Sequence, residues 1–175
     1  SPYMGKDCMA ELVDKERFPG RAIVGLCRTS NQEAWEIQDL VLLNGRPLWE
    51  VIAEKTLRWA EELGVAENAG LVMGAAYNDP DTGQPYSQHL LRCREIVGDK
   101  LWFLIPGVGT QGGLVEETVR AAFVGWGSIA INSSSGIIFA SAGDDFAEAA
   151  AREAKKLKEQ MEAALEKIAQ PSGAY

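Results

Sequence analysis

An apolar run that passes through a glycine-rich loop into a helical pattern constrains the fold of this chain more than any other stretch. The run Leu101–Ile105 is too short for a helix and predicts a strand that is buried on both faces. The loop after it reads PGVGTQGG over residues 106–113, and a helical pattern then continues to about Ala122. Such an arrangement is expected in folds built from βα units.

The loop at residues 106–113 has the composition of an anion-binding site. The free backbone N–H groups at a helix N-terminus, together with the helix dipole, attract an anion, most often a phosphate. Glycines let the backbone approach a ligand closely, and the side chain of Gln111 adds hydrogen-bonding groups. The alternative is an ordinary tight connection between a strand and a helix, because glycine motifs alone have many false positives.

Strand-like and helix-like stretches alternate along the rest of the chain. Apolar runs predict further buried strands at Arg21–Cys27, Ala69–Gly74 and Ser128–Asn132, and periodic apolar residues predict helices at Pro47–Leu63, at Gln88–Val97 and from Phe146 onward. This order predicts an α/β fold with a parallel sheet of βα units.

Two polar clusters indicate where a site would lie. Arg28–Asn31 follows the first predicted strand, and Asn132–Gly136 follows the last. The carboxyl ends of parallel strands meet at one edge of the sheet, where such folds place their sites. Loops suited to phosphate on the last two strands match the phosphate site of a (βα)8 barrel. We therefore predict the βα units of such a barrel, as one domain over residues 1–170 with a tail at 171–175, and a doubly wound parallel sheet is the alternative.

The charge balance and the cysteines narrow the classes of partner and compartment. A net charge of −8 argues against an extended nucleic-acid surface but is compatible with a small anion pocket. No window reaches the roughly 18 consecutive apolar residues of a membrane span. Cys8, Cys27 and Cys93 are odd in number and lack the spacing of metal ligands, which favours reduced thiols in a cytoplasmic protein without a metal site.

His89 is the only histidine of the chain, and it falls in the predicted helix Gln88–Val97. The helix follows a long polar loop, so we expect His89 to have a surface or packing role, away from the strand ends. No Ser-His-Asp arrangement is visible in the sequence, which gives no independent reason to assign nucleophilic catalysis.

Five stretches follow one another in the order that a known family shows. They read PYMGKD at residues 2–7, LCRTSN at 26–31, GLVMGA at 70–75, LIPGVGTQGG at 104–113 and INSS at 131–134. On these stretches the chain resembles orotidine 5′-phosphate decarboxylase, in the branch with a Thr-Ser-Asn loop. The resemblance implies a lyase of pyrimidine biosynthesis that acts as a dimer. It would convert orotidine 5′-phosphate (OMP) to UMP and CO2 without cofactor or metal.

The same resemblance assigns roles to the candidate site residues. Thr29 and Ser30 would lie beside the pyrimidine, with Ser30 at its amide edge, although the residues alone make Ser30 a simple strand-end turn residue. The 5′-phosphate would be held by the glycine loop. The full set of expected substrate-binding residues is Thr29, Ser30, Pro106, Gly109, Gln111, Gly112, Ser134 and Ser135.

Two departures from the family pattern limit this reading. The family's Asp-x-Lys-x-x-Asp motif, whose lysine protonates the developing carbanion at C6, is absent, so no catalytic residue is assigned. The chain thus resembles only the C-terminal half of the barrel, about strands five to eight. The position after the Asn-Ser-Ser loop holds Ser135 where the family has an arginine that binds phosphate. Losing that bidentate contact weakens binding by about tenfold to a hundredfold.

Half a barrel would expose the edges of its sheet and an apolar inner face. We therefore expect a partner that completes it, either an N-terminal half-barrel or a second copy of this chain. Three functions remain open: the binding half of the decarboxylase, a non-catalytic module or half-barrel scaffold that retains weak affinity for a phosphorylated ligand, and another phosphate-binding barrel enzyme, which the Thr-Ser-Asn and Asn-Ser-Ser loops disfavour.

Overall fold

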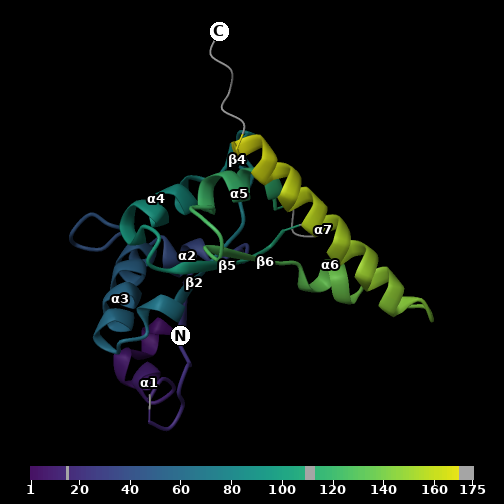
Figure 1. Ribbon diagram of the computed structural model, residues 1–175. Coiled ribbons are helices and arrows are strands. Elements are labelled where there is room, and N and C mark those ends of the chain that lie inside the picture. The colour runs from purple at the N-terminus through teal and green to yellow at the C-terminus, as the bar shows by residue number, and fades with distance from the viewer. Residues whose placement is uncertain (15, 109–112, 170–175) are drawn as a thin grey trace.

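A four-stranded parallel sheet forms the centre of the computed structural model, which describes residues 1–14, 16–108 and 113–169. The strands lie in the order β1 (Val24–Arg28), β2 (Gly70–Met73), β5 (Trp102–Pro106) and β6 (Ile129–Asn132) (Figure 1). The predicted parallel α/β sheet is thus confirmed. Its strands follow chain order without a reversal, as in a barrel, whereas a doubly wound sheet reverses its order at a switch point.

Helices connect the successive strands and form a curved layer outside them (Figure 1). α3 (Leu48–Glu62) leads from β1 to β2, α4 (Gln88–Val97) from β2 to β5, and α5 (Val115–Ala122) from β5 to β6. The shorter and outlying elements are η1 (Pro2–Met4), α1 (Lys6–Ala10), α2 (Trp35–Gln38), η2 (Ala66–Asn68), the hairpin β3 (Tyr77–Asn78) and β4 (Pro85–Tyr86), α6 (Ser134–Ile138) and α7 (Phe146–Ala169).

The core lies between the sheet and helices α3, α4 and α5. Leu71 and Phe103 pair across β2 and β5 on this face, and both side chains are fully buried. Gly25 occupies the same row in β1, where an added Cβ would lie 2.8 Å from Oγ1 of Thr56 in α3. A glycine here therefore lets α3 pack closely against the sheet.

The opposite face of the sheet is apolar but less covered. Leu26, Val72 and Leu104 form one row across the strands, and Leu26 is 46% exposed. The prediction that Leu101–Ile105 is buried on both faces is therefore wrong. Phe103 and Ile105 are buried in β5, whereas Leu104 between them is half-buried, because the helices pack on only the Phe103 face.

The C-terminal helix α7 packs against α5 and α6 (Figure 1). Ala149 and Ala164 are its buried residues, and Lys167 forms an ion pair with Glu116 at the start of α5. No helix within the described ranges combines the length and the apolar character needed to cross a bilayer.

Candidate functional site

A cavity of about 950 Å³ lies at the carboxyl ends of β1, β2 and β5. Its wall includes Arg28–Asn31 at the end of β1, Gly74 and Ala75 after β2, and Gly107 and Gly113 at the two ends of the glycine loop. The structure thus brings Thr29 and Ser30 to the same cavity as the ends of the glycine loop. Their contact with a ligand stays a prediction.

The end of β2 lies very close to the Thr-Ser-Asn segment. The N–H of Gly74 donates to the carbonyl of Arg28 at 2.6 Å. A Cβ on Gly74 would lie 3.0 Å from the backbone nitrogen of Ser30 and 3.1 Å from the carbonyl carbon of Thr29. Because these are backbone atoms, a larger residue at Gly74 would displace the wall of the cavity.

The described ends of the glycine loop are hydrogen-bonded to each other and to the segment that follows β2. The N–H of Gly113 donates to the carbonyl of Gly107 at 3.1 Å, and a Cβ on Gly113 would lie 2.4 Å from that oxygen. The N–H of Leu114 donates to the carbonyl of Ala76 at 2.7 Å. Three of the predicted phosphate ligands lie outside the described residues: Gly109, Gln111 and Gly112.

The loop after β6 meets the glycine loop through Ser133, whose Oγ donates to the carbonyl of Val108 at 3.1 Å. The hydroxyl of Ser134 pairs instead with the side chain of Asn132. Ser134 and Ser135 are exposed at the beginning of α6. Among the described residues that line the cavity, Pro106, Ser134 and Ser135 are absent. The structure therefore does not bring these three predicted substrate-binding residues to its wall.

Arg28 forms a bidentate ion pair with Asp39, with both N···O distances at 2.9 Å. Burial lowers the pKa of Arg28, but the hydrogen bonds and charge of Asp39 outweigh this and raise it. The guanidinium is therefore charged and oriented by Asp39.

Gln38, which sequence analysis missed, holds Thr29 from the end of α2. Its Oε1 accepts the Thr29 N–H at 2.8 Å, and its Nε2 donates to Thr29 Oγ1 at 3.0 Å. Gln38 lies nine residues after Thr29, and Asp39 lies eleven residues after Arg28. Neither spacing matches the period of a helix or a strand, so the sequence pattern did not indicate these contacts. Only the fold of the intervening segment brings them together.

His89 lies behind the strand ends, beside a second cavity of about 370 Å³. It is buried, and its Nε2 donates to the carbonyl of Gly74 at 2.8 Å. The ring stacks on Tyr86 with centroids 5.7 Å apart. Burial lowers the pKa of His89 to about 4, while the bond to Gly74 acts in the opposite direction. The prediction of a position away from the strand ends is wrong, because the residue contacts the end of β2.

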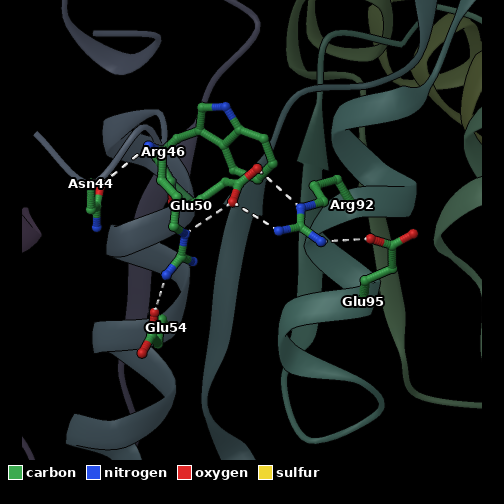
Figure 2. A network of polar contacts seen from close by, with 8 residues as sticks. Asn44, Arg46, Glu50, Glu54, Arg92 and Glu95 are labelled. Carbon is green, nitrogen blue, oxygen red and sulfur yellow. Dashed lines mark hydrogen bonds and ion pairs between the residues drawn. The ribbon is translucent and has the colours of Figure 1, made fainter. Parts of the chain in front are cut away.

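A network centred on Glu50 joins α3, α4 and the turn before α3. Figure 2 shows the Glu50 carboxylate between Arg46 and Arg92, with N···O distances of 3.0 to 3.2 Å. These guanidiniums, Arg92 foremost, lower the pKa of Glu50. Each arginine also pairs with a second carboxylate, Arg46 with Glu54 and Arg92 with Glu95. The network therefore holds the turn that leads from Asp39 into α3 against two helices.

No family model matches the chain, but individual proteins are similar to nearly all of it. Orotidine 5′-phosphate decarboxylase of Ralstonia nicotianae is 40% identical over 162 residues, which are 92% of this chain and 54% of that protein. The enzyme of the same name from Dehalococcoides mccartyi is 36% identical, again over 54% of its length. The chain thus spans about half the length of the curated relatives it matches.

Comparison with solved structures finds proteins with the same or a related name. The structure of Leishmania donovani OMP decarboxylase is 30% identical and superimposes with a TM-score of 0.61, covering 91% of this chain and 54% of that one. Leishmania donovani UMP synthase is 31% identical with a TM-score of 0.62, and 32% of its chain is covered. The chain is therefore similar, along nearly its whole length, to about half of an orotidine 5′-phosphate decarboxylase.

Proposed function

We propose that this chain forms the phosphate- and pyrimidine-binding part of an orotidine 5′-phosphate decarboxylase. The observation that carries the proposal is the cavity of about 950 Å³, whose wall combines the Thr-Ser-Asn segment with both ends of the glycine loop. Its ligand would be OMP or UMP. Ser30 would meet the amide edge of the pyrimidine, and the glycine loop, with Gly109, Gln111 and Gly112, would hold the 5′-phosphate.

The proposal places the decarboxylation machinery on other polypeptide. The sequence contains no Asp-x-Lys-x-x-Asp motif, so a lysine that protonates C6 would come from elsewhere. This chain would bind the substrate and orient its pyrimidine. Proton delivery to C6 would begin only when a lysine-bearing half joins the sheet.

A partner half-barrel is supported by the uncovered face of the sheet. Val24 is 41% exposed and Leu26 is 46% exposed on a face that would line the inside of a barrel. Burying apolar surface stabilises by about 25 cal/mol per Å², which favours covering these residues with further strands. We propose that an N-terminal half-barrel, or a second copy of this chain, supplies them, and that the assembly acts in the cytoplasm as a dimer.

Ser135 favours a second candidate, a non-catalytic module that retains weak affinity for a phosphorylated ligand. A serine cannot form the bidentate, charge-assisted contact of an arginine with phosphate. The affinity for a nucleotide would be lower by about tenfold to a hundredfold than with arginine at that position.

Calorimetry and a turnover assay separate these functions. We expect the purified chain to bind UMP and to leave OMP unchanged. Adding the lysine-bearing N-terminal half of a relative should restore CO2 release if the chain is a part of the enzyme. Binding without restored turnover would favour the non-catalytic module, and the absence of UMP binding would contradict both.

A further inference from the structure

The amide of Gln38 is oriented by Thr29 without ambiguity. The backbone N–H of Thr29 is a donor only, so the group 2.8 Å from it must be the amide oxygen of Gln38. The amide nitrogen therefore faces the hydroxyl of Thr29, at 3.0 Å. Because an amide N–H donates and never accepts, the Thr29 oxygen must act as the acceptor in this bond.

This orientation decides where the hydroxyl hydrogen of Thr29 can go. It cannot point toward the amide nitrogen of Gln38, because that group is itself a donor. The hydroxyl can also donate to Gln38 Oε1, but that contact is 3.5 Å long, well beyond the roughly 2.7–2.8 Å typical of an O–H···O bond, so it holds the hydrogen only weakly. The hydrogen is thus available to an acceptor elsewhere around Thr29, which lines the cavity of about 950 Å³.

Thr29 is also held in place by its neighbours. Asp39, next to Gln38 in the chain, fixes the preceding Arg28 through two hydrogen bonds. Gly74 packs closely against the backbone of Thr29 and Ser30. A hydroxyl on a segment held by several contacts loses little further freedom when a ligand binds, which favours affinity.

We infer that Gln38 is a positioning residue that makes the Thr29 hydroxyl a hydrogen-bond donor to the occupant of the cavity. The site then selects a ligand that presents an acceptor at Thr29, such as a carbonyl oxygen of a pyrimidine. The choice of pyrimidine rests on the proposed function, whereas the direction of the hydroxyl rests on the geometry alone.

The direction of the hydroxyl can be reversed by one substitution. In Gln38→Glu both side-chain oxygens are acceptors, so the Thr29 N–H bond is retained but the hydroxyl donates to residue 38 instead of to the ligand. We expect this variant to bind UMP about tenfold more weakly, Thr29→Val to bind about threefold to tenfold more weakly, and Thr29→Ser to bind as the wild type does.

Gln32→Glu is the matched control for charge, because Gln32 is exposed and lines the same cavity. It adds the same negative charge at a position that takes no part in the bonds between Gln38 and Thr29. In a Thr29→Val background, the effect of Gln38→Glu should shrink to that of Gln32→Glu. An equally large effect of Gln38→Glu with and without the Thr29 hydroxyl would overturn the inference while leaving UMP binding, and thus the proposed function, in place.

The hydrogen bond between Gln38 and Thr29 can also be tested without a ligand. Amide hydrogen exchange followed by NMR should show the Thr29 N–H protected in the wild type and in Gln38→Glu, and exposed in Gln38→Ala. Equal protection in wild type and Gln38→Ala would overturn the role of Gln38 even if no nucleotide binds. A wild-type chain that fails to bind UMP but shows this exchange pattern would retain the hydroxyl geometry and contradict only the proposed function.

Discussion

The guanidinium of Arg94 in α4 lies over the ring of Phe103 in β5, with its Cζ 3.5 Å from the ring centroid. The same group donates to four backbone carbonyls at 2.7 to 2.9 Å, those of Gly98, Leu101, Ala122 and Ser128. Burial lowers the pKa of Arg94 to about 10, so the side chain remains charged at neutral pH. One cation therefore joins the ends of α4 and α5 to the beginnings of β5 and β6, opposite the edge that carries the cavity.

Arg94→Lys should destabilise the fold strongly. A lysine keeps the charge but lacks the planar fork that reaches several carbonyls at once. Leaving buried acceptors unpaired costs about 1–3 kcal/mol each, so we expect the free energy of unfolding to fall by about 3 kcal/mol. Urea unfolding measures this. Arg120→Lys, an exposed arginine paired with Glu116, is the control and should change stability by less than about 0.5 kcal/mol; equal losses in both variants would refute the role of Arg94.

His89 should make the fold less stable in mild acid. Its pKa is about 4 in the fold and about 6.5 when unfolded, so the unfolded chain binds the proton more readily. The stabilisation is fully present above pH 6.5 and is lost as the pH falls toward 4, and between pH 7 and 5 the loss should be about 2 kcal/mol.

His89→Gln provides the comparison for this pH dependence. A glutamine can still donate to the carbonyl of Gly74 but does not titrate. Denaturant unfolding at pH 7, 6 and 5 should therefore give a flatter profile for the variant than for the wild type. The carboxylates with lowered pKa, such as Glu50, affect stability only at lower pH, because their unfolded values lie near 4.5. Parallel profiles for the two proteins would be inconsistent with a neutral, buried His89.

Gly74→Ala should move the wall of the cavity. The new Cβ would meet backbone atoms of Thr29 and Ser30 at 3.0 to 3.2 Å, and backbone cannot rotate away as a side chain can. Overpacking of this kind costs about 1–3 kcal/mol, and we expect weaker UMP binding as well. Gly143→Ala is the control, since its Cβ would make ordinary contacts with side-chain oxygens alone, 3.4 Å from Oδ1 of Asp145 and 3.5 Å from Oγ of Ser141. Unchanged UMP affinity in folded Gly74→Ala would show that this close approach does not shape the site.

Ser135→Arg should strengthen the binding of UMP and leave that of uridine unchanged. The substitution restores the residue that the family resemblance places against the phosphate, and the expected gain is about tenfold to a hundredfold. Calorimetry at two salt concentrations should show the gain shrinking at high salt. Ala140→Arg, an exposed site beyond α6, controls for added charge. A similar gain from both arginines would mean that net charge, and not a contact at position 135, is responsible.

The sequence predicted the strands and the edge of the sheet that holds the cavity because both depend on local patterns. Short apolar runs and the turn residues after them located β1, β2, β5 and β6 to within a few residues. Contacts made by segments far apart in the chain left no such pattern. Three sets of hydrogen bonds depend on how α2 and α4 pack, which periodicity alone does not predict. They are the bond between His89 and Gly74, the bonds between Gln38 and Thr29, and the four bonds of Arg94. The uncovered face of β5 was missed for a related reason, since a run of apolar residues does not show which face a helix will cover.

An NMR titration of the isotope-labelled chain with UMP tests the central claim most directly. If these strand ends share one nucleotide site, UMP should change the NMR chemical shifts of Thr29, Ser30, Gly74 and Gly113, which line the cavity. Distant residues such as Ala164 in α7 should change little. Shifts scattered over the surface, or none at millimolar UMP, would contradict a pyrimidine nucleotide site at these strand ends.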